Sequence, residues 1–175
     1  MKFLYSDEPI IACSTCNHAN AALAVLRISG FKHLDAFLPF FSHSGPIEPR
    51  RVYYTKLRSG DEVFDDICLT YFKGPKSYNG ENILELSIHG NTLNTERILK
   101  FFIDKANCRL AAPGEFTYRA LKNKKLTLSQ VEGLDLFLNA NSGYALDQGL
   151  SLLSGNLQEI YTELYDLFLK HKSAL

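Results

Sequence analysis

Apolar and polar residues alternate most clearly between residues 80 and 91, which read GENILELSIHGN. In a strand, a two-residue period puts apolar side chains on one face and ionisable or hydroxyl groups on the other: Leu84, Leu86 and Ile88 against Glu85, Ser87 and His89. The pattern predicts a strand with one buried face. Its polar face is either a solvated sheet surface or a wall of a binding site, and residues 85 to 89 span about 13 Å at roughly 3.3 Å per residue.

Five further strands are predicted, the last of them a short strand or edge segment: residues 9–14, 21–28, 51–57, 63–72 and 108–112. Ser-Gly-Asp at residues 59–61 predicts a hairpin between the third and fourth of these segments. Residues 42–49 and 74–80 are rich in glycine and proline, which favours loops there.

Helical spacing predicts an amphipathic helix at residues 31–41 and a short helix at residues 116–123. Between them, Asn91 can cap a third helix because its side chain can accept a hydrogen bond from the first turn. The buried side of that third helix is predicted to consist of Leu93, Ile98, Phe101 and Phe102.

Beyond Leu126 only helical spacing remains. Thr127 or Ser129 can cap a helix there, and NANSG at residues 139–143 interrupts it. Apolar residues then recur at alternating steps of four and three: Leu146, Leu150, Leu153, Leu157, Ile160, Leu164 and Leu167. This heptad seam predicts a helix that packs on a partner helix from a larger protein, on a second copy, or on its own domain.

Together these elements predict an α+β fold, with a mixed sheet and flanking helices over residues 1–122 and a partial helical domain over residues 123–175. With 46% hydrophobic residues, the chain can bury a core. Its 19 basic and 19 acidic residues balance, so only a local basic patch would attract nucleic acid. The sequence shows neither an export signal nor a membrane-length apolar run, so we expect no membrane association, a cytoplasmic location and reduced cysteines.

Three charged residues stand out from their surroundings. Arg27 ends an apolar segment, Glu85 lies between two leucines, and Lys125 closes a basic cluster. A charge within an apolar strand is costly unless it is paired, so Arg27 and Glu85 either pair with each other or hold a ligand between them. A carboxylate can accept two parallel N–H bonds from a guanidine-like edge such as that of a pterin, while the cations hold carboxylates.

Other kinds of site have less support in the sequence. Cys13, Cys16 and His18 have a spacing that suits part of a metal or redox site, but a structural zinc needs four ligands and no second motif supplies them. His89 is either a general base or a support for the following loop. Neither the P-loop motif of nucleotide-binding proteins nor the nucleophile motif GxSxG occurs, so no catalytic residue is predicted.

Several motifs follow one another in a specific order. They are LRISG at 26–30, GPKSYNGENILEL at 74–86, HGN at 89–91, and PGEF at 113–116 with Arg119, Ala120, Asn123, Lys125, Leu126, Leu128, Gln130 and Glu132 after it. In order and spacing these motifs resemble the N-terminal part of the MnmE (TrmE) family of tRNA modification GTPases. The resemblance runs from about residue 9 to the end of the sequence.

The resemblance implies a fold like that of the glycine-cleavage type of tetrahydrofolate-binding domain, which in this family also mediates homodimerisation. It implies that Arg27, Glu85 and Lys125 contact 5-formyltetrahydrofolate or another one-carbon tetrahydrofolate. For the intact family protein it implies GTP-dependent modification of the tRNA wobble uridine at carbon 5, together with an FAD-containing MnmG-like partner. The GTPase motifs are not in this sequence, so we expect no GTP hydrolysis from it.

Two alternatives stay open. One is a stand-alone folate-dependent one-carbon transferase that uses the same pocket. The other is a dimerisation scaffold whose ligand site has been lost. The family's first loop is rich in glycine, whereas residues 14–22 read STCNHANAA, and the family's HGG and TGED read HGN and NGEN here. These departures favour the scaffold over a working pocket.

Overall fold

The structure is a computed structural model that describes residues 8–15 and 20–172, with the side chains of residues 156–159 also left aside. The chain divides into two compact units, Met1–Phe116 and Thr117–Leu175. The predicted boundary between a domain over residues 1–122 and a partial helical domain over residues 123–175 stays a prediction. The division into compact units does not say which residues belong to a ligand-binding domain.

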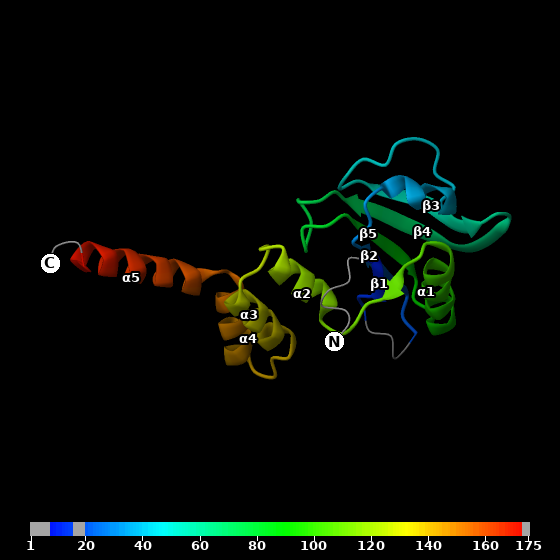
Figure 1. The fold of residues 1–175 in the computed structure, drawn as a ribbon. Coiled ribbons are helices and arrows are strands. Elements are labelled where there is room, and N and C mark those ends of the chain that lie inside the picture. Colours follow the sequence, from blue (N-terminus) through cyan, green and yellow to red (C-terminus); the bar gives the residue numbers. More distant parts are fainter. Residues whose placement is uncertain (1–7, 16–19, 173–175) are drawn as a thin grey trace. The chain divides into compact units, whose positions relative to one another are not determined.

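The first unit is built on a six-stranded sheet in the order β3-β4-β5-β2-β1-β6 (Figure 1). Its strands are β1 Ile10–Cys13, β2 Leu23–Ser29, β3 Val52–Ser59, β4 Glu62–Phe72, β5 Ile83–His89 and β6 Arg109–Leu110. Neighbouring strands are antiparallel except β1 and β6, which are parallel. The mixed sheet confirms the α+β class, and the six strands lie where the alternation predicted them.

The central strand β5 has the two faces that its sequence predicted. Leu84, Leu86 and Ile88 are fully buried, while Glu85 is half-buried on the opposite face and His89 is exposed. The buried face continues across the neighbouring strands through Leu26, Ile28, Ile67 and Leu69. The core therefore lies on one side of the sheet. Arg27 of β2 and Glu85 of β5, which are opposite each other in the register, lie on the other side.

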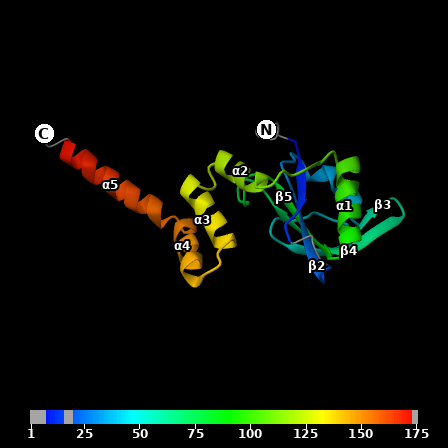
Figure 2. The same cartoon turned by 90° about the horizontal axis from the view of Figure 1, so that it is seen from below.

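Helix α1, Thr92–Lys105, packs on the sheet and contributes to this core (Figure 2). The side chain of Asn91 accepts a hydrogen bond of 3.2 Å from the backbone N–H of Asn94, which confirms the predicted cap. Three of the four residues predicted to face inwards are buried: Ile98, Phe101 and Phe102. Leu93 is 76% exposed, so its assignment was wrong. It lies roughly 150° around the helix from the centre of the buried side, at about 100° per residue.

The predicted helix over residues 31–41 was also wrong. The segment forms two short 3₁₀ turns, η2 Leu34–Ala36 and η3 Leu38–Phe40. Pro39 has no backbone N–H and its ring would clash with the preceding turn of an α-helix, so a continuous helix cannot form there. Phe37 and Phe41 are buried nonetheless, which shows that the apolar pattern identified core residues correctly.

The second unit contains only helices in its described part. They are α3 Leu128–Leu138, α4 Gly143–Leu153 and α5 Asn156–Lys172, preceded by α2 Glu115–Lys122, which crosses the division between the units. Thr127 caps α3 through a reciprocal pair of hydrogen bonds with Gln130, which selects it over Ser129. No helix that the structure describes is long and apolar enough to cross a membrane.

Helices α3 and α4 approach each other closely because glycines face their contact. A Cβ atom on Gly133 would lie 2.6 Å from the Cβ of Leu152, and one on Gly149 would lie 2.6 Å from the backbone nitrogen of Phe137. The backbones could not pack at this distance with larger side chains at these two positions.

The heptad seam does not lie on one continuous helix. The chain turns at Ser154 and Gly155, where Gly155 adopts a φ of +89°, so the seam is divided between α4 and α5. On α5, Ile160, Leu164 and Leu167 are each more than half exposed. Leu157 belongs to the side chains outside the description, so the seam is defined on α5 by these three residues.

Candidate functional site

Arg27 and Glu85 lie opposite each other on the adjacent central strands β2 and β5. The Nε and Nη2 groups of Arg27 donate hydrogen bonds of 2.9 and 2.7 Å to Oε1 of Glu85. The two side chains are 25% and 27% exposed, so the pair is half-buried on the face of the two strands that lies opposite the core. The pairing that the sequence left as one alternative is therefore present.

The ion pair leaves part of the carboxylate available. Both donors from Arg27 end on Oε1, and no described residue donates a hydrogen bond to Oε2 of Glu85. An ionised carboxylate offers about four acceptor positions and Arg27 uses two of them, so Glu85 retains about half of its capacity while it is paired. A structural bridge and a ligand contact are consequently compatible at this position.

Two aromatic rings flank the guanidinium group of Arg27. Its Cζ atom lies 5.4 Å from the centroid of the Tyr78 ring and 5.7 Å from that of the Phe116 ring. Cation–π contacts of this kind are worth about 0.5–2 kcal/mol each, depending on exposure. The rings put flat apolar surfaces beside the charged pair.

Sequence reasoning did not select Tyr78 or Phe116, although both lie inside quoted motifs. Their approach to Arg27 depends on the path of two loops, which periodicity does not report. Phe116 directly follows a motif glutamate and Tyr78 lies two residues before a motif glycine, and these positions were the available signal.

The loop that carries Tyr78 is held by a buried polar network. The amide of Asn79 donates to Oγ of Ser29 at 2.8 Å and to Oε2 of Glu81 at 3.0 Å, and Ser29 donates to the same Glu81 oxygen at 2.8 Å. Ser29 and Asn79 are fully buried. Because each polar group in this network is satisfied, the loop between β4 and β5 has a defined position.

The segment before Phe116 is fixed by a second buried contact. Nη1 and Nη2 of Arg109 donate to the two carboxylate oxygens of Glu115 at 2.9 and 2.7 Å, and the backbone N–H of Ala112 donates to the carboxylate at 2.9 Å. The Glu115 side chain is completely buried. The hydrogen bonds from Arg109 to Glu115 raise the pKa of the Arg109 guanidinium. They also give the glutamate of PGEF a structural role, directly before Phe116.

Lys125 belongs to the second unit. It is exposed in the turn between α2 and α3, where its backbone N–H donates to the carbonyl oxygen of Ala120 at 2.8 Å. The structure brings Arg27 and Glu85 together within the first unit, and the contribution of Lys125 to their site stays a prediction.

His89 supports the adjoining structure through Asp65. Its Nδ1 lies 2.6 Å from Oδ1 of Asp65, and its backbone N–H donates to Oδ2 at 2.9 Å. Oδ2 also accepts from the side chain of Asn94, so Asp65 joins β4, β5 and α1. The hydrogen bond and the charge of Asp65 raise the pKa of His89.

The predicted cysteine site falls largely outside the description. Cys13 is described, with its thiol 3.3 Å from the hydroxyl of Thr15, whereas Cys16 and His18 lie outside the described residues. Within residues 8–15 and 20–172, no group of three or more potential metal-ligating side chains is present.

The class of protein follows from three features: an α+β domain, an arginine–glutamate pair across its central strands, and the GP-S and PGEF segments beside that pair. Together they define an N-terminal domain of the TrmE type. Residues 9–125 match the sequence profile of the family described as the N-terminus of the GTP-binding protein TrmE, and the chain belongs to this family. It corresponds to the N-terminal domain of the tRNA modification GTPase MnmE.

Curated relatives include the tRNA modification GTPase MnmE of Aquifex aeolicus (strain VF5), which is 38% identical over 154 residues, or 87% of this chain and 34% of the relative. The MnmE of Mycoplasma mycoides subsp. mycoides SC is 32% identical over 160 residues, which cover 91% of this chain and 35% of that relative. The MnmE of Clostridioides difficile (strain 630) is 33% identical over 168 residues, which cover 93% of this chain and 36% of that relative. The chain thus spans about a third of the length of these relatives.

Proposed function

We propose that this chain is the folate-binding and dimer-forming N-terminal region of a tRNA modification GTPase. The observation that carries the proposal is the pair of Arg27 and Glu85, which lies across the two central strands and leaves Oε2 of Glu85 without a described donor. The rings of Tyr78 and Phe116 flank this pair, which suits a flat heterocycle. The ligand is 5-formyltetrahydrofolate or another one-carbon tetrahydrofolate.

Each residue has a separate part in this proposal. Glu85 accepts N–H groups from the pterin edge, because a carboxylate binds a planar pair of donors well. Arg27 orients Glu85 and, with Lys125, holds carbonyl or carboxylate groups of the ligand. Bound folate supplies a one-carbon unit, and the residues of this chain only bind and orient it.

The wider context is part of the same proposal. Residues 1–122 form the folate-binding-like homodimerisation domain and residues 123–175 the beginning of a helical domain. The intact protein acts in the cytoplasm on the wobble uridine of tRNA, uses GTP and works with an FAD-containing MnmG-like partner. The names of the relatives, all tRNA modification GTPases, support the parts of this context that concern tRNA and GTP.

Isothermal titration calorimetry of the 175-residue chain with 5-formyltetrahydrofolate tests the ligand. We expect binding by the wild type, loss of binding in Glu85→Ala, and binding like the wild type in Ser87→Ala. Ser87 is a matched control because it lies on the same face of β5 and is also half-buried. No heat at high micromolar ligand, or unchanged binding after Glu85→Ala, would contradict the proposal.

A dimerisation scaffold without a ligand is the second candidate. It is favoured by the ion pair of 2.7 Å between Arg27 and Glu85, which gives each charge an opposite charge within the chain. Sedimentation velocity showing a dimer, combined with a melting temperature that does not respond to folate, would select the scaffold over the binding module.

A further inference from the structure

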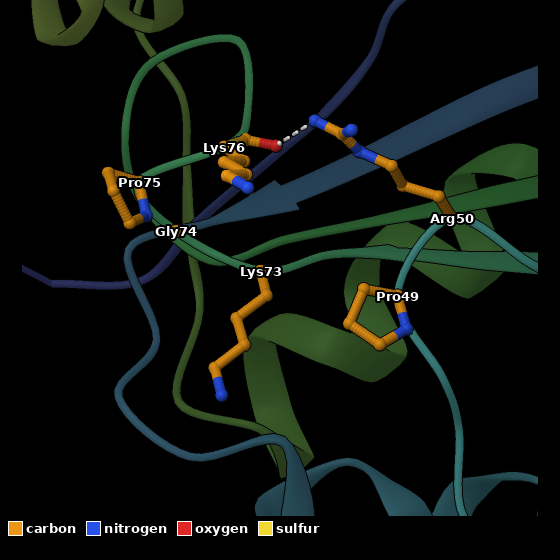
Figure 3. A pocket seen from close by; sticks show the side chains of 6 residues that line it. All are labelled: Pro49, Arg50, Lys73, Gly74, Pro75 and Lys76. Atoms are coloured by element: carbon orange, nitrogen blue, oxygen red, sulfur yellow. Dashed lines mark hydrogen bonds between the residues drawn. The ribbon is translucent and has the colours of Figure 1, made fainter.

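A cavity of about 370 Å³ opens in the first unit, and neither Arg27 nor Glu85 lines it. Two segments line it: the residues before β3 and those after β4, namely Pro49, Arg50, Lys73, Gly74, Pro75 and Lys76 (Figure 3). Three of the six lining residues are cations and none is an acid. We name this cavity the basic hollow.

The cations of the basic hollow are not neutralised by neighbouring acids. In the described part of the chain, no carboxylate forms an ion pair with Arg50, Lys73 or Lys76. The acids nearest in sequence are engaged elsewhere: Glu48 pairs with Arg51 at 2.9 Å, and Glu81 accepts from Ser29 and Asn79. In a chain of zero net charge, three unpaired cations around one cavity make a local positive site.

The backbone that carries these cations is fixed. The backbone N–H of Arg50 donates to the carbonyl oxygen of Tyr71 at 2.8 Å, and its Nη2 donates to the carbonyl oxygen of Lys76 at 3.0 Å (Figure 3). The N–H of Gly74 donates to the side chain of Asn82 at 3.1 Å. A Cβ atom on Gly74 would lie 2.7 Å from the carbonyl oxygen of Gly80, so the loop folds closely on itself.

We propose that the basic hollow binds the phosphate backbone of RNA. The lining offers point charges and one guanidinium fork, which are the groups that contact phosphates. It has no aromatic ring on which a base would stack and no carboxylate that would hold a ribose. The contacts would therefore position an RNA without reading its sequence.

The shape of the hollow favours a polymer over a small anion. Its cationic residues and Pro75 are exposed, so a small ligand would remain largely in water instead of being enclosed. Figure 3 shows the amino group of Lys73 well apart from the guanidinium of Arg50, so these two charges do not converge on one phosphate. Successive phosphates of one strand match such a spread arrangement. The inference rests on the proposed function in that tRNA is the substrate of the intact protein.

Fluorescence anisotropy with a labelled, unmodified tRNA transcript tests the proposal on the full chain. The test variant is Arg50→Gln/Lys73→Gln/Lys76→Gln. The control variant is Arg58→Gln/Lys100→Gln/Lys105→Gln, which removes the same charge from three exposed residues that do not line the hollow. We expect the test variant to bind about tenfold more weakly or worse, with a salt dependence reduced by roughly two in slope, and the control to change less than about twofold.

Equal weakening by both variants, no change in the test variant, or no RNA binding by the wild type would each overturn the proposal. A second arm titrates inorganic phosphate and ATP: binding of either at micromolar concentration, lost only in the test variant, would assign the hollow to a small phosphorylated ligand and overturn the RNA assignment. Calorimetry with 5-formyltetrahydrofolate on the same proteins separates the two ideas. We expect folate binding to survive in the test variant, and absence of folate binding by the wild type would contradict the proposed function alone.

Discussion

Removal of the Glu115 carboxylate is predicted to destabilise the first unit strongly and to disturb the candidate site. Glu115→Ala deletes the hydrogen bonds that Arg109 and the backbone of Ala112 donate to a side chain with no solvent exposure. Removing one partner of a buried ion pair typically costs about 3–5 kcal/mol. Arg109 is 30% exposed and keeps Glu8 at 3.2 Å, so the low end applies and we expect a loss of about 3 kcal/mol.

Urea denaturation followed by circular dichroism measures this change in the free energy of unfolding. Glu115→Gln keeps the shape and one acceptor, so we expect about half the loss of the alanine variant. Glu96→Ala is the matched control, since Glu96 is exposed on α1. A loss below about 1 kcal/mol for Glu115→Ala would refute the reasoning, because it would mean that the buried pair is energetically neutral.

Two further predictions concern helix packing and pH. Gly149→Ala is expected to lower the melting temperature, because a new Cβ would lie 2.6 Å from the backbone of Phe137 and overpacking costs about 1–3 kcal/mol; Gly143→Ala, whose Cβ would meet nothing within 4 Å, is the control in the same thermal melt. His89 has a raised pKa in the folded state, so its pairing with Asp65 stabilises the fold fully below pH 6.5 and is lost as the pH rises through the raised value. Urea melts should therefore separate wild type from His89→Asn more at pH ~5.5 than at pH ~8.5, and an equal difference at both would contradict the assignment.

The alternation of apolar residues predicted the sheet well because its core lies on one face. Leu84, Leu86 and Ile88 must all point inwards, so their spacing reports the strand directly. The pairing of Arg27 with Glu85 was one of two open alternatives, since a strand pattern locates each charge but not the register between strands.

Failures arose where a single residue overrode a periodic pattern. Pro39 divides the segment after β2 into two turns, and Gly155 divides the heptad seam between two helices. The apolar residues at both places kept their spacing, but the backbone could not continue as an α-helix. Tyr78 and Phe116 were missed for a different reason, because loop paths and buried polar networks bring them to Arg27.

The two 3₁₀ turns in residues 31–41 have a consequence for the outer edge of the sheet. Strand β3 is terminal in the sheet and eight residues long, so its outward backbone groups would be a template for another protein's strand. The chain that leaves the second 3₁₀ turn instead bridges Phe41 to Leu57 and lets the N–H of Ser42 donate to the carbonyl oxygen of Lys56 at 3.0 Å. An irregular Leu57–Arg58 step in the same strand adds to this protection. By ending as extended chain, the segment covers the outer backbone of Lys56 and Leu57, so this part of the edge is closed to a strand of another protein.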